Sequence, residues 1–137
     1  KAIGRLEDLP RFARTALEET IALTAGNDGM VLRLALSYGG RTEMADAARA
    51  LARDVAAGRV DAQSIDDETL RGYLYDSETP DPDLVVRTAG EMRLSNFLLW
   101  QASYAELYVT DEHKAIDPLF FGPLEGTPLH ILIKVAQ

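Results

Sequence analysis

Cysteine is absent from the sequence, and this absence removes several chemistries at once. Disulfides, thiol nucleophiles and cysteine-ligated zinc or iron–sulfur centres are excluded. The only histidines are His113 and His130, which leaves little for a histidine-based metal site. No apolar run approaches the roughly 20 residues of a membrane-spanning helix, and no secretory signal pattern opens the chain. We therefore expect a cytoplasmic protein without a transmembrane segment.

Basic residues are also scarce relative to acidic ones. The 137 residues include 14 Lys and Arg against 22 Asp and Glu, a formal net charge of −8. Because non-specific duplex binding depends on neutralising phosphates with basic side chains, we expect no nucleic-acid partner. The net charge does not exclude a local basic pocket that binds a small anion. The length corresponds to one domain with a single core.

Three segments show the apolar periodicity of helices. The first runs from Leu9 to Ile21, with Asp8 as its expected cap, Pro10 in its first turn and Gly26 beyond its end. The second begins near Thr42 and stops at Gly58, and a short third helix is expected over 66–75.

Strands alternate with these helices. Met30–Tyr38 is nearly all apolar and ends in Gly39-Gly40, which indicates a buried parallel strand. Further strands are expected over 84–86 and 105–110, with a helix over 94–102 between them. This order predicts an α/β fold, a partial parallel sheet flanked by helices. Because three strands are few for such a sheet, and the chain starts at Lys1 rather than Met, we expect the N-terminal part of the fold to be missing.

Residues 112–137 differ in character from the rest. Prolines at 118, 123 and 128 alternate with apolar pairs, and a strand is possible over 129–135. We divide the chain into an α/β body, 1–111, and a divergent tail, 112–137. The tail is expected to pack poorly against the α/β body.

A cluster of anion-binding side chains follows the strand at 84–86. Arg87 ends that strand, where ligands bind in open α/β sheets. Arg93 and Ser95 fall at the expected start of the next helix, whose free N–H groups favour anions. Since a guanidinium binds oxygens bidentately, these residues predict a phosphate or diphosphate clamp. The alternative is two solvated arginines paired with Glu91 and Asp83.

Glu106 is the second candidate, because it lies within the apolar strand at 105–110 beside Tyr104 and Tyr108. It either faces solvent at an edge or serves as a ligand, and a carboxylate suits Mg²⁺. We expect Arg87, Arg93 and Glu106 to share one end of the sheet and to face a common cleft.

Two further features have simple structural interpretations. Gly39-Gly40 either lets the backbone approach a ligand or makes the strand-to-helix turn, and the turn is favoured. Trp100, with its neighbours Leu98 and Leu99, is expected in the core.

Several of these segments together resemble one enzyme family. From about Ile3 to Asp111 the chain resembles the cis-prenyltransferases, the undecaprenyl diphosphate synthases. The resemblance implies that the body, 1–111, is the C-terminal part of that family's catalytic domain. The matching segments are Leu-Thr-Ala-Gly-Asn at 23–27, Tyr-Gly-Gly-Arg at 38–41, Pro-Asp-Pro-Asp-Leu at 80–84, Arg87-Thr88, Gly90-Glu91, Arg93-Leu94-Ser95-Asn96-Phe97-Leu98-Leu99-Trp100-Gln101, and Ala105-Glu106-Leu107-Tyr108.

The resemblance implies a transferase that condenses isopentenyl diphosphate onto an allylic diphosphate such as farnesyl diphosphate. Its product would be a cis-polyprenyl diphosphate, a lipid carrier for cell-wall synthesis. By motif match, Arg87, Arg93 and Ser95 would hold the diphosphate of isopentenyl diphosphate, Leu94 would touch it through its backbone, and Glu106 would bind Mg²⁺. The family further implies a cytoplasmic homodimer, with peripheral membrane contact through the lipid product.

The departures from the family pattern concern the catalytic half. The family's Asp-Gly-Asn-Gly-Arg motif is absent, so the expected catalytic aspartate would lie upstream of Lys1, and no catalytic residue is assigned within this chain. We therefore expect an isopentenyl diphosphate half-site that is inactive alone. The alternatives are a non-catalytic subunit of a heteromeric prenyltransferase, in which the clamp would be broken, and a non-functional gene fragment.

Overall fold

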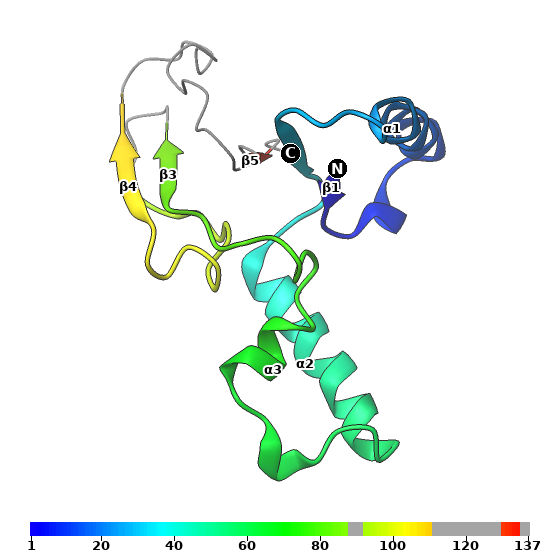
Figure 1. Ribbon diagram of the computed structural model, residues 1–137, viewed down its shortest axis with the longest axis vertical. Coiled ribbons are helices and arrows are strands. Elements are labelled where there is room, and N and C mark those ends of the chain that lie inside the picture. The colour runs from blue at the N-terminus through cyan, green and yellow to red at the C-terminus, as the bar shows by residue number, and fades with distance from the viewer. Residues whose placement is uncertain (88–91, 111–129, 135–137) are drawn as a thin grey trace. The chain divides into compact units, whose positions relative to one another are not determined.

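The computed structural model describes residues 1–87, 92–110 and 130–134 (Figure 1). The chain divides into two units, one formed by Lys1–Tyr38 with Glu112–Gln137 and the other by Gly39–Asp111. Each unit combines parallel strands with helices, so the predicted α/β class is confirmed. The three predicted strands do not share one sheet, however, because they are distributed over both units.

The first unit contains a three-stranded parallel sheet in the order β1-β2-β5. Its elements are β1 (Ala2–Ile3), the 3₁₀ turn η1 (Leu6–Asp8), α1 (Arg11–Thr24), β2 (Val31–Ala35) and β5 (His130–Lys134). The predicted helix and strand are thus confirmed, whereas β1 was not expected. Two residues are too short for a strand signal in the sequence.

The tail contributes β5, and the expectation that it packs poorly is wrong for residues 130–134. These residues pair with β2 in a parallel register from Val31↔His130 to Ala35↔Lys134. The physical reason is that β2 has a second edge to satisfy, and an apolar, partly β-branched segment fits it. The rest of the tail lies outside the described residues.

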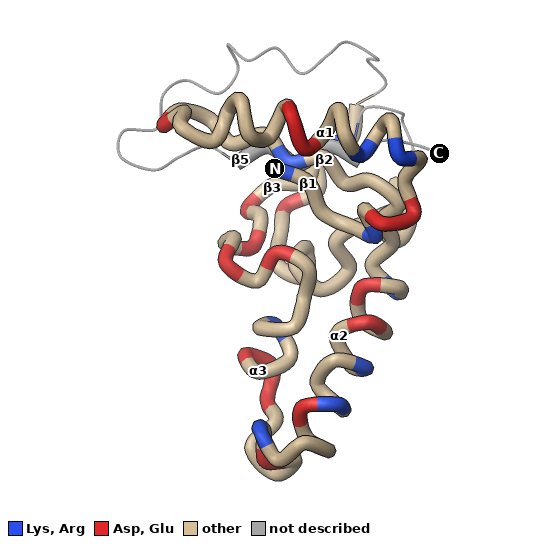
Figure 2. Tube along the Cα trace, turned by 90° about the vertical axis from the view of Figure 1, so that its right-hand side faces the viewer, with Lys and Arg blue, Asp and Glu red and all other residues tan. Residues whose placement is uncertain are grey.

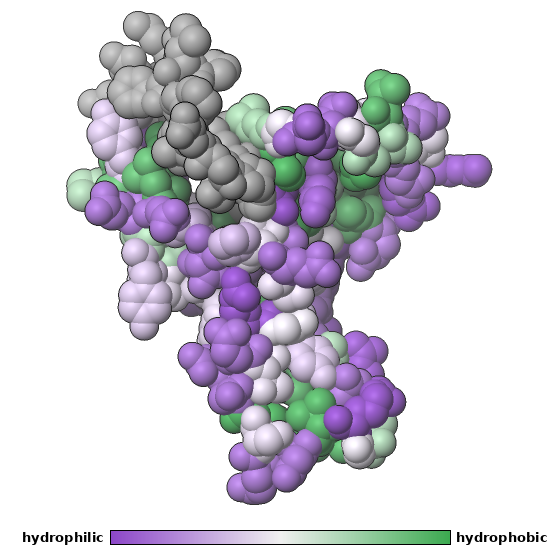
Figure 3. Space-filling view, in the orientation of Figure 1, coloured by the Kyte–Doolittle hydropathy of each residue, from purple (hydrophilic) through white to green (hydrophobic). Residues whose placement is uncertain are grey.

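Helix α1 begins at Arg11, slightly later than the predicted start at Leu9, and its cap differs. Pro10 occupies the N-cap position without a side-chain hydrogen bond, and the Asp8 carboxylate instead accepts from Ser37 Oγ at 3.5 Å. No residue of α1 is buried. Phe12 and Leu23 are 79% and 84% exposed, and Figure 3 shows apolar side chains on the surface around this helix. Phe12 and Leu23 are therefore not covered by the described part of the chain, whereas Ala13, Leu17 and Ile21 on the same helix are half-buried.

The second unit is built on a long helix. Its elements are α2 (Gly40–Ala56), the 3₁₀ turn η2 (Ala62–Ser64), α3 (Asp67–Arg71), β3 (Leu84–Arg87) and β4 (Glu106–Val109). Gly58 has φ +70° just past the end of α2, as its sequence position predicts. Asp66 caps α3 by accepting from the Thr69 N–H at 2.8 Å.

Two tyrosines join the segment after α3 to α2. The Tyr73 hydroxyl donates to Asp54 at 2.6 Å, and the Tyr75 hydroxyl donates to Asp46 at 2.6 Å. The bond from Tyr73, supported by Arg59, lowers the pKa of Asp54 below its usual value. Acidic and basic residues both lie along α2 (Figure 2). These polar contacts link the two segments beside a small apolar core.

The single core expected from the chain length is replaced by two small ones. The buried apolar residues described are Ile3 and Ala35 in the first unit and Ala47, Leu51, Leu74, Leu98 and Ala102 in the second. Burial of Leu98 confirms its expected place in the core, while Trp100 is half-buried. None of the described helices has the length and apolarity needed to cross a membrane.

Candidate functional site

Arg87 lies where the sequence predicts, at the carboxyl end of a strand. β3 and β4 run parallel, with Arg87 opposite Val109 in the last register position. The Thr110 N–H donates to the Arg87 carbonyl at 2.9 Å and extends the pairing by one residue. The backbone of Arg87 is therefore fixed by the sheet, and its side chain is half-buried.

The predicted helix over 94–102 is wrong, because these residues form a series of turns. Ser95, Asn96 and Leu98 have positive φ values of 49°, 58° and 46°, which no right-handed helix accommodates. Single turns are closed by bonds such as that from the Phe97 N–H to the Leu94 carbonyl at 3.1 Å. The anion-binding helix N-terminus expected at Arg93 and Ser95 is consequently not there.

The turns are held instead by docking against the start of α2. The Gly40 N–H donates to the Asn96 carbonyl, and the Arg41 N–H donates to Asn96 Oδ1, both at 2.8 Å. The docking also explains the two glycines. A Cβ on Gly39 would lie 2.7 Å from Asn96 Nδ2, and one on Gly40 would lie 2.9 Å from Leu99 Cγ. Gly39-Gly40 therefore admits a close approach by the Asn96 and Leu99 side chains, beyond making a turn.

Sequence reasoning missed this contact, although one signal was present. α2 starts after Gly39, which has no side chain to cap it, and no Ser, Thr, Asp or Asn stands at that position. A helix start without a local cap needs acceptors from elsewhere. Asn96 is an amide of the capping type, and it supplies them from 55 positions away.

A buried carboxylate holds the other end of the same turns. Glu43, in the first turn of α2, is 1% exposed. Its oxygens accept from Gln101 Nε2 at 3.1 and 3.2 Å and from the Tyr75 N–H at 3.0 Å. Glu43 stands on the apolar face of α2 in the sequence, so a buried charge there was not anticipated.

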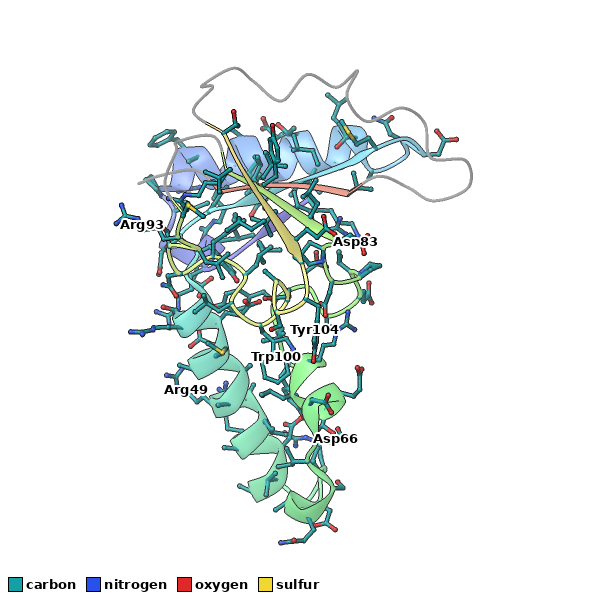
Figure 4. All side chains as sticks on the ribbon, turned by 90° about the vertical axis from the view of Figure 1, so that its left-hand side faces the viewer. Arg49, Asp66, Asp83, Arg93, Trp100 and Tyr104 are labelled. Carbon is teal, nitrogen blue, oxygen red and sulfur yellow. The ribbon has the colours of Figure 1, made fainter. Side chains whose placement is uncertain are left out.

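The residues between these anchors and β3 are open to solvent. Arg93, Leu94, Ser95 and Asn96 are all exposed. Figure 4 places Arg93 and Asp83 on opposite sides of this unit, so Asp83 is not the partner of Arg93. Glu91, the other expected partner, lies outside the described residues. An open hollow of about 300 Å³ lies beside this surface, lined by Arg41, Asn96 and Leu99.

Glu106 does not share an end of the sheet with Arg87. It is the first residue of β4 and stands opposite Leu84, the first residue of β3, with its N–H donating to the Asp83 carbonyl at 2.8 Å. Three residues of strand, about 10 Å, separate its register position from that of Arg87. The prediction that Arg87, Arg93 and Glu106 face a common cleft is therefore wrong for Glu106. Glu106 lies at the amino end of the two parallel strands, whereas Arg87 lies at their carboxyl end.

The described residues do not by themselves complete a Mg²⁺ site. They contain no group of three His, Asp or Glu side chains placed to hold a metal ion. Glu106 is an exposed single carboxylate at the amino edge of the two strands. A lone carboxylate is a weak ligand for an ion that gives up its waters reluctantly.

Comparison with known proteins agrees with the resemblance seen in the sequence. The family model described as putative undecaprenyl diphosphate synthase matches residues 1–114. An isoprenyl transferase of Heliobacterium mobile is 51% identical over 110 residues, covering 80% of this chain and 42% of the relative. A tritrans,polycis-undecaprenyl-diphosphate synthase (geranylgeranyl-diphosphate specific) of Pyrococcus horikoshii is 50% identical, covering 80% and 41%.

A solved structure supports the same relationship. Lavandulyl diphosphate synthase from Lavandula x intermedia, in complex with dimethylallyl diphosphate, is 40% identical with a TM-score of 0.78. The match covers 82% of this chain and 48% of that structure, so the chain spans less than half the length of these relatives. The fold, the motifs and the matched residues agree: this chain belongs to the undecaprenyl diphosphate synthase family of prenyltransferases.

Proposed function

We propose that this chain carries the binding site for the diphosphate of isopentenyl diphosphate in a cis-prenyltransferase. The complete enzyme would condense that substrate onto an allylic diphosphate such as farnesyl diphosphate. One observation carries the proposal beyond the family relationship. The turn Arg93–Ser95 is exposed, and the residue that follows it is bonded to the first turn of α2. A cation and a hydroxyl are thus presented to solvent on an anchored backbone.

Each residue of the site has a distinct task. The guanidinium groups of Arg87 and Arg93 would bind diphosphate oxygens through charge-assisted, bidentate hydrogen bonds. The Ser95 hydroxyl would donate one further bond, and the Leu94 backbone would contribute a contact without side-chain chemistry. Binding of this kind positions the alkene of the substrate, which gains rate by holding a reacting group close and aligned.

The proposal assigns no complete reaction to this chain. Condensation needs both diphosphates in place, and correct positioning of two reactants is worth about 7–11 kcal/mol. The family motif that would hold the allylic diphosphate is absent from these 137 residues. We assign no step to Mg²⁺, because the described residues do not by themselves complete a site for it. We therefore propose a substrate-binding half-site that is inactive by itself.

The cellular setting follows from the family relationship. We propose a cytoplasmic homodimer whose product, a cis-polyprenyl diphosphate, serves as a lipid carrier for cell-wall synthesis. Contact with the membrane would then be peripheral and would run through the lipid product. The exposed Leu107 and Tyr108 on β4, 43% and 59% accessible, are compatible with a further protein surface covering this strand.

Binding of isopentenyl diphosphate to the chain, measured by NMR titration, tests the proposal. Loss of one charge-assisted contact costs about 1.5–3 kcal/mol, so Arg93→Ala should weaken binding about 10- to 100-fold. Arg49→Ala is the matched control, because Arg49 is an exposed arginine of α2 that pairs with Asp46. Equal affinities for the two variants, or no binding by the unaltered chain, would overturn the proposal.

A further inference from the structure

The N-terminus of α2 and the proposed diphosphate-binding turn are joined through one residue, Asn96. A helix leaves its first backbone N–H groups without intrahelical acceptors. Here Gly39 at the N-cap supplies no side chain, and the Gly40 and Arg41 N–H groups donate to the carbonyl and Oδ1 of Asn96. Asn96 therefore acts as the cap of a helix that begins 56 positions before it.

The turn that carries Asn96 is conformationally strained. Ser95, Asn96 and Leu98 all lie in the left-handed region, which Asn tolerates better than Ser or Leu. Such backbone states persist only where surrounding contacts impose them, and they concentrate at functional sites. The contacts imposing this one are the two bonds to Asn96 and the burial of Leu98 at 6% exposure.

The strained segment is immediately next to the proposed binding residues. Ser95 precedes Asn96 directly, and the bond from the Phe97 N–H to the Leu94 carbonyl closes a turn around them. We therefore expect a change in the Asn96 contact to move the backbone of Leu94 and Ser95, which belong to the same turn. The Arg93 side chain starts from the same short segment.

We infer that Asn96 is a positioning residue for diphosphate binding: by capping α2 it holds Ser95 and Arg93 in the geometry that receives the diphosphate. The inference rests on the proposed function of the turn. It gives the Gly39-Gly40 pair a second role, because any side chain at Gly39 would push on the Asn96 amide. Asn96 itself is not placed in contact with substrate.

Two variants perturb this contact from opposite sides. Asn96→Gly tolerates the positive φ and keeps the carbonyl bond to Gly40, but it removes Oδ1 from the Arg41 N–H. Gly39→Ala leaves Asn96 intact and places a methyl group 2.7 Å from its Nδ2. The backbone of Gly39 is extended, with φ −154°, so alanine adds no backbone strain there. The matched control is Asp66→Gly, which removes the cap of α3.

Isopentenyl diphosphate affinity and the urea midpoint are measured for all four proteins. Asn96→Gly and Gly39→Ala should each weaken binding about tenfold, which corresponds to about 1.4 kcal/mol. Asp66→Gly should lower the urea midpoint only slightly and keep its affinity within about twofold, because loss of a cap on another helix does not move the turn. If Asn96→Gly does not fold, Gly39→Ala carries the test, since its clash meets only a movable amide.

The outcomes separate this inference from the proposed function. Unchanged affinity in Asn96→Gly and Gly39→Ala, with binding intact in the unaltered chain, overturns the positioning role and leaves the proposed function standing. Equal loss of affinity in Asp66→Gly also overturns it, since any lost cap would then suffice. Failure of the unaltered chain to bind isopentenyl diphosphate overturns the proposed function and this inference with it.

Discussion

Replacing Glu43 by alanine should destabilise the second unit more than any surface change. The carboxylate is 1% exposed and accepts hydrogen bonds from the Tyr75 N–H at 3.0 Å and from Gln101 Nε2 at 3.1 Å. Glu43→Ala would leave both donors without their acceptor and would open a cavity beside α2. Because Gln101 belongs to the turns that follow the binding residues, those turns should loosen as well.

The magnitude follows from the number of orphaned groups. Each buried donor left unsatisfied costs about 1–3 kcal/mol, so Glu43→Ala should cost about 2–6 kcal/mol. Glu43→Gln keeps one acceptor oxygen and the side-chain volume, and it should cost about half as much. Against a total stability of about 5–15 kcal/mol for a domain, the alanine variant should be close to unfolding.

Urea denaturation followed by far-UV circular dichroism measures the effect. Glu78→Gln is the control, because Glu78 is an exposed glutamate of the same unit and should change stability by no more than about 0.5 kcal/mol. The reasoning is refuted if Glu43→Ala and Glu78→Gln unfold at the same urea concentration. That result would mean that the buried carboxylate is not bonded as described.

Three further predictions use other contacts. The Tyr73 hydroxyl lowers the pKa of Asp54, so the stability that this bond contributes is present above the ordinary carboxyl value of 3.8 and is lost as pH falls through the lower pKa of the folded state. Tyr73→Phe should therefore make the urea midpoint fall less steeply as the pH is lowered from 5. The same pH dependence in both proteins would contradict this prediction. Gly40→Ala should cost about 1–3 kcal/mol by overpacking against Leu99, whereas Gly29→Ala meets open space and should cost nothing measurable by the same assay. The chain alone should incorporate no labelled isopentenyl diphosphate onto farnesyl diphosphate, and clear turnover free of contaminating enzyme would show that the catalytic residues were misplaced.

The elements fixed by local signals were predictable from the sequence. The sequence of α2 has continuous apolar periodicity and a glycine at position 58. The structure has a helix over this segment, and Gly58 adopts a positive φ just beyond its end. Strand β3 was predicted over 84–86 and observed over Leu84–Arg87. The position of Arg87 at the carboxyl end of β3 could be predicted because it requires only that the end of one strand be located correctly. These features depend on a few neighbouring residues, which a sequence displays directly.

The errors arose where distant contacts overrule local preference. The apolar spacing of 94–102 favours a helix, yet docking of Asn96 on α2 imposes a left-handed backbone. Glu106 was assigned correctly to a strand, but the register, which puts it opposite Leu84, depends on pairing between segments more than 20 residues apart. The β2–β5 pairing is a longer-range case still. Local patterns carry no information on which segments meet.

The most direct test of the account is a titration of the ¹⁵N-labelled chain with isopentenyl diphosphate, observed as backbone amide shifts by NMR. Because a half-site should bind weakly, with a Kd of about 1 mM or somewhat tighter, this method suits the expected affinity. The account predicts saturable shifts centred on Leu94, Ser95 and Asn96 and extending to Arg41 through its bond to Asn96, with smaller shifts from isopentenyl monophosphate. Shifts confined to other segments, or none at all, would contradict the central claim that the docked turn is the diphosphate-binding site.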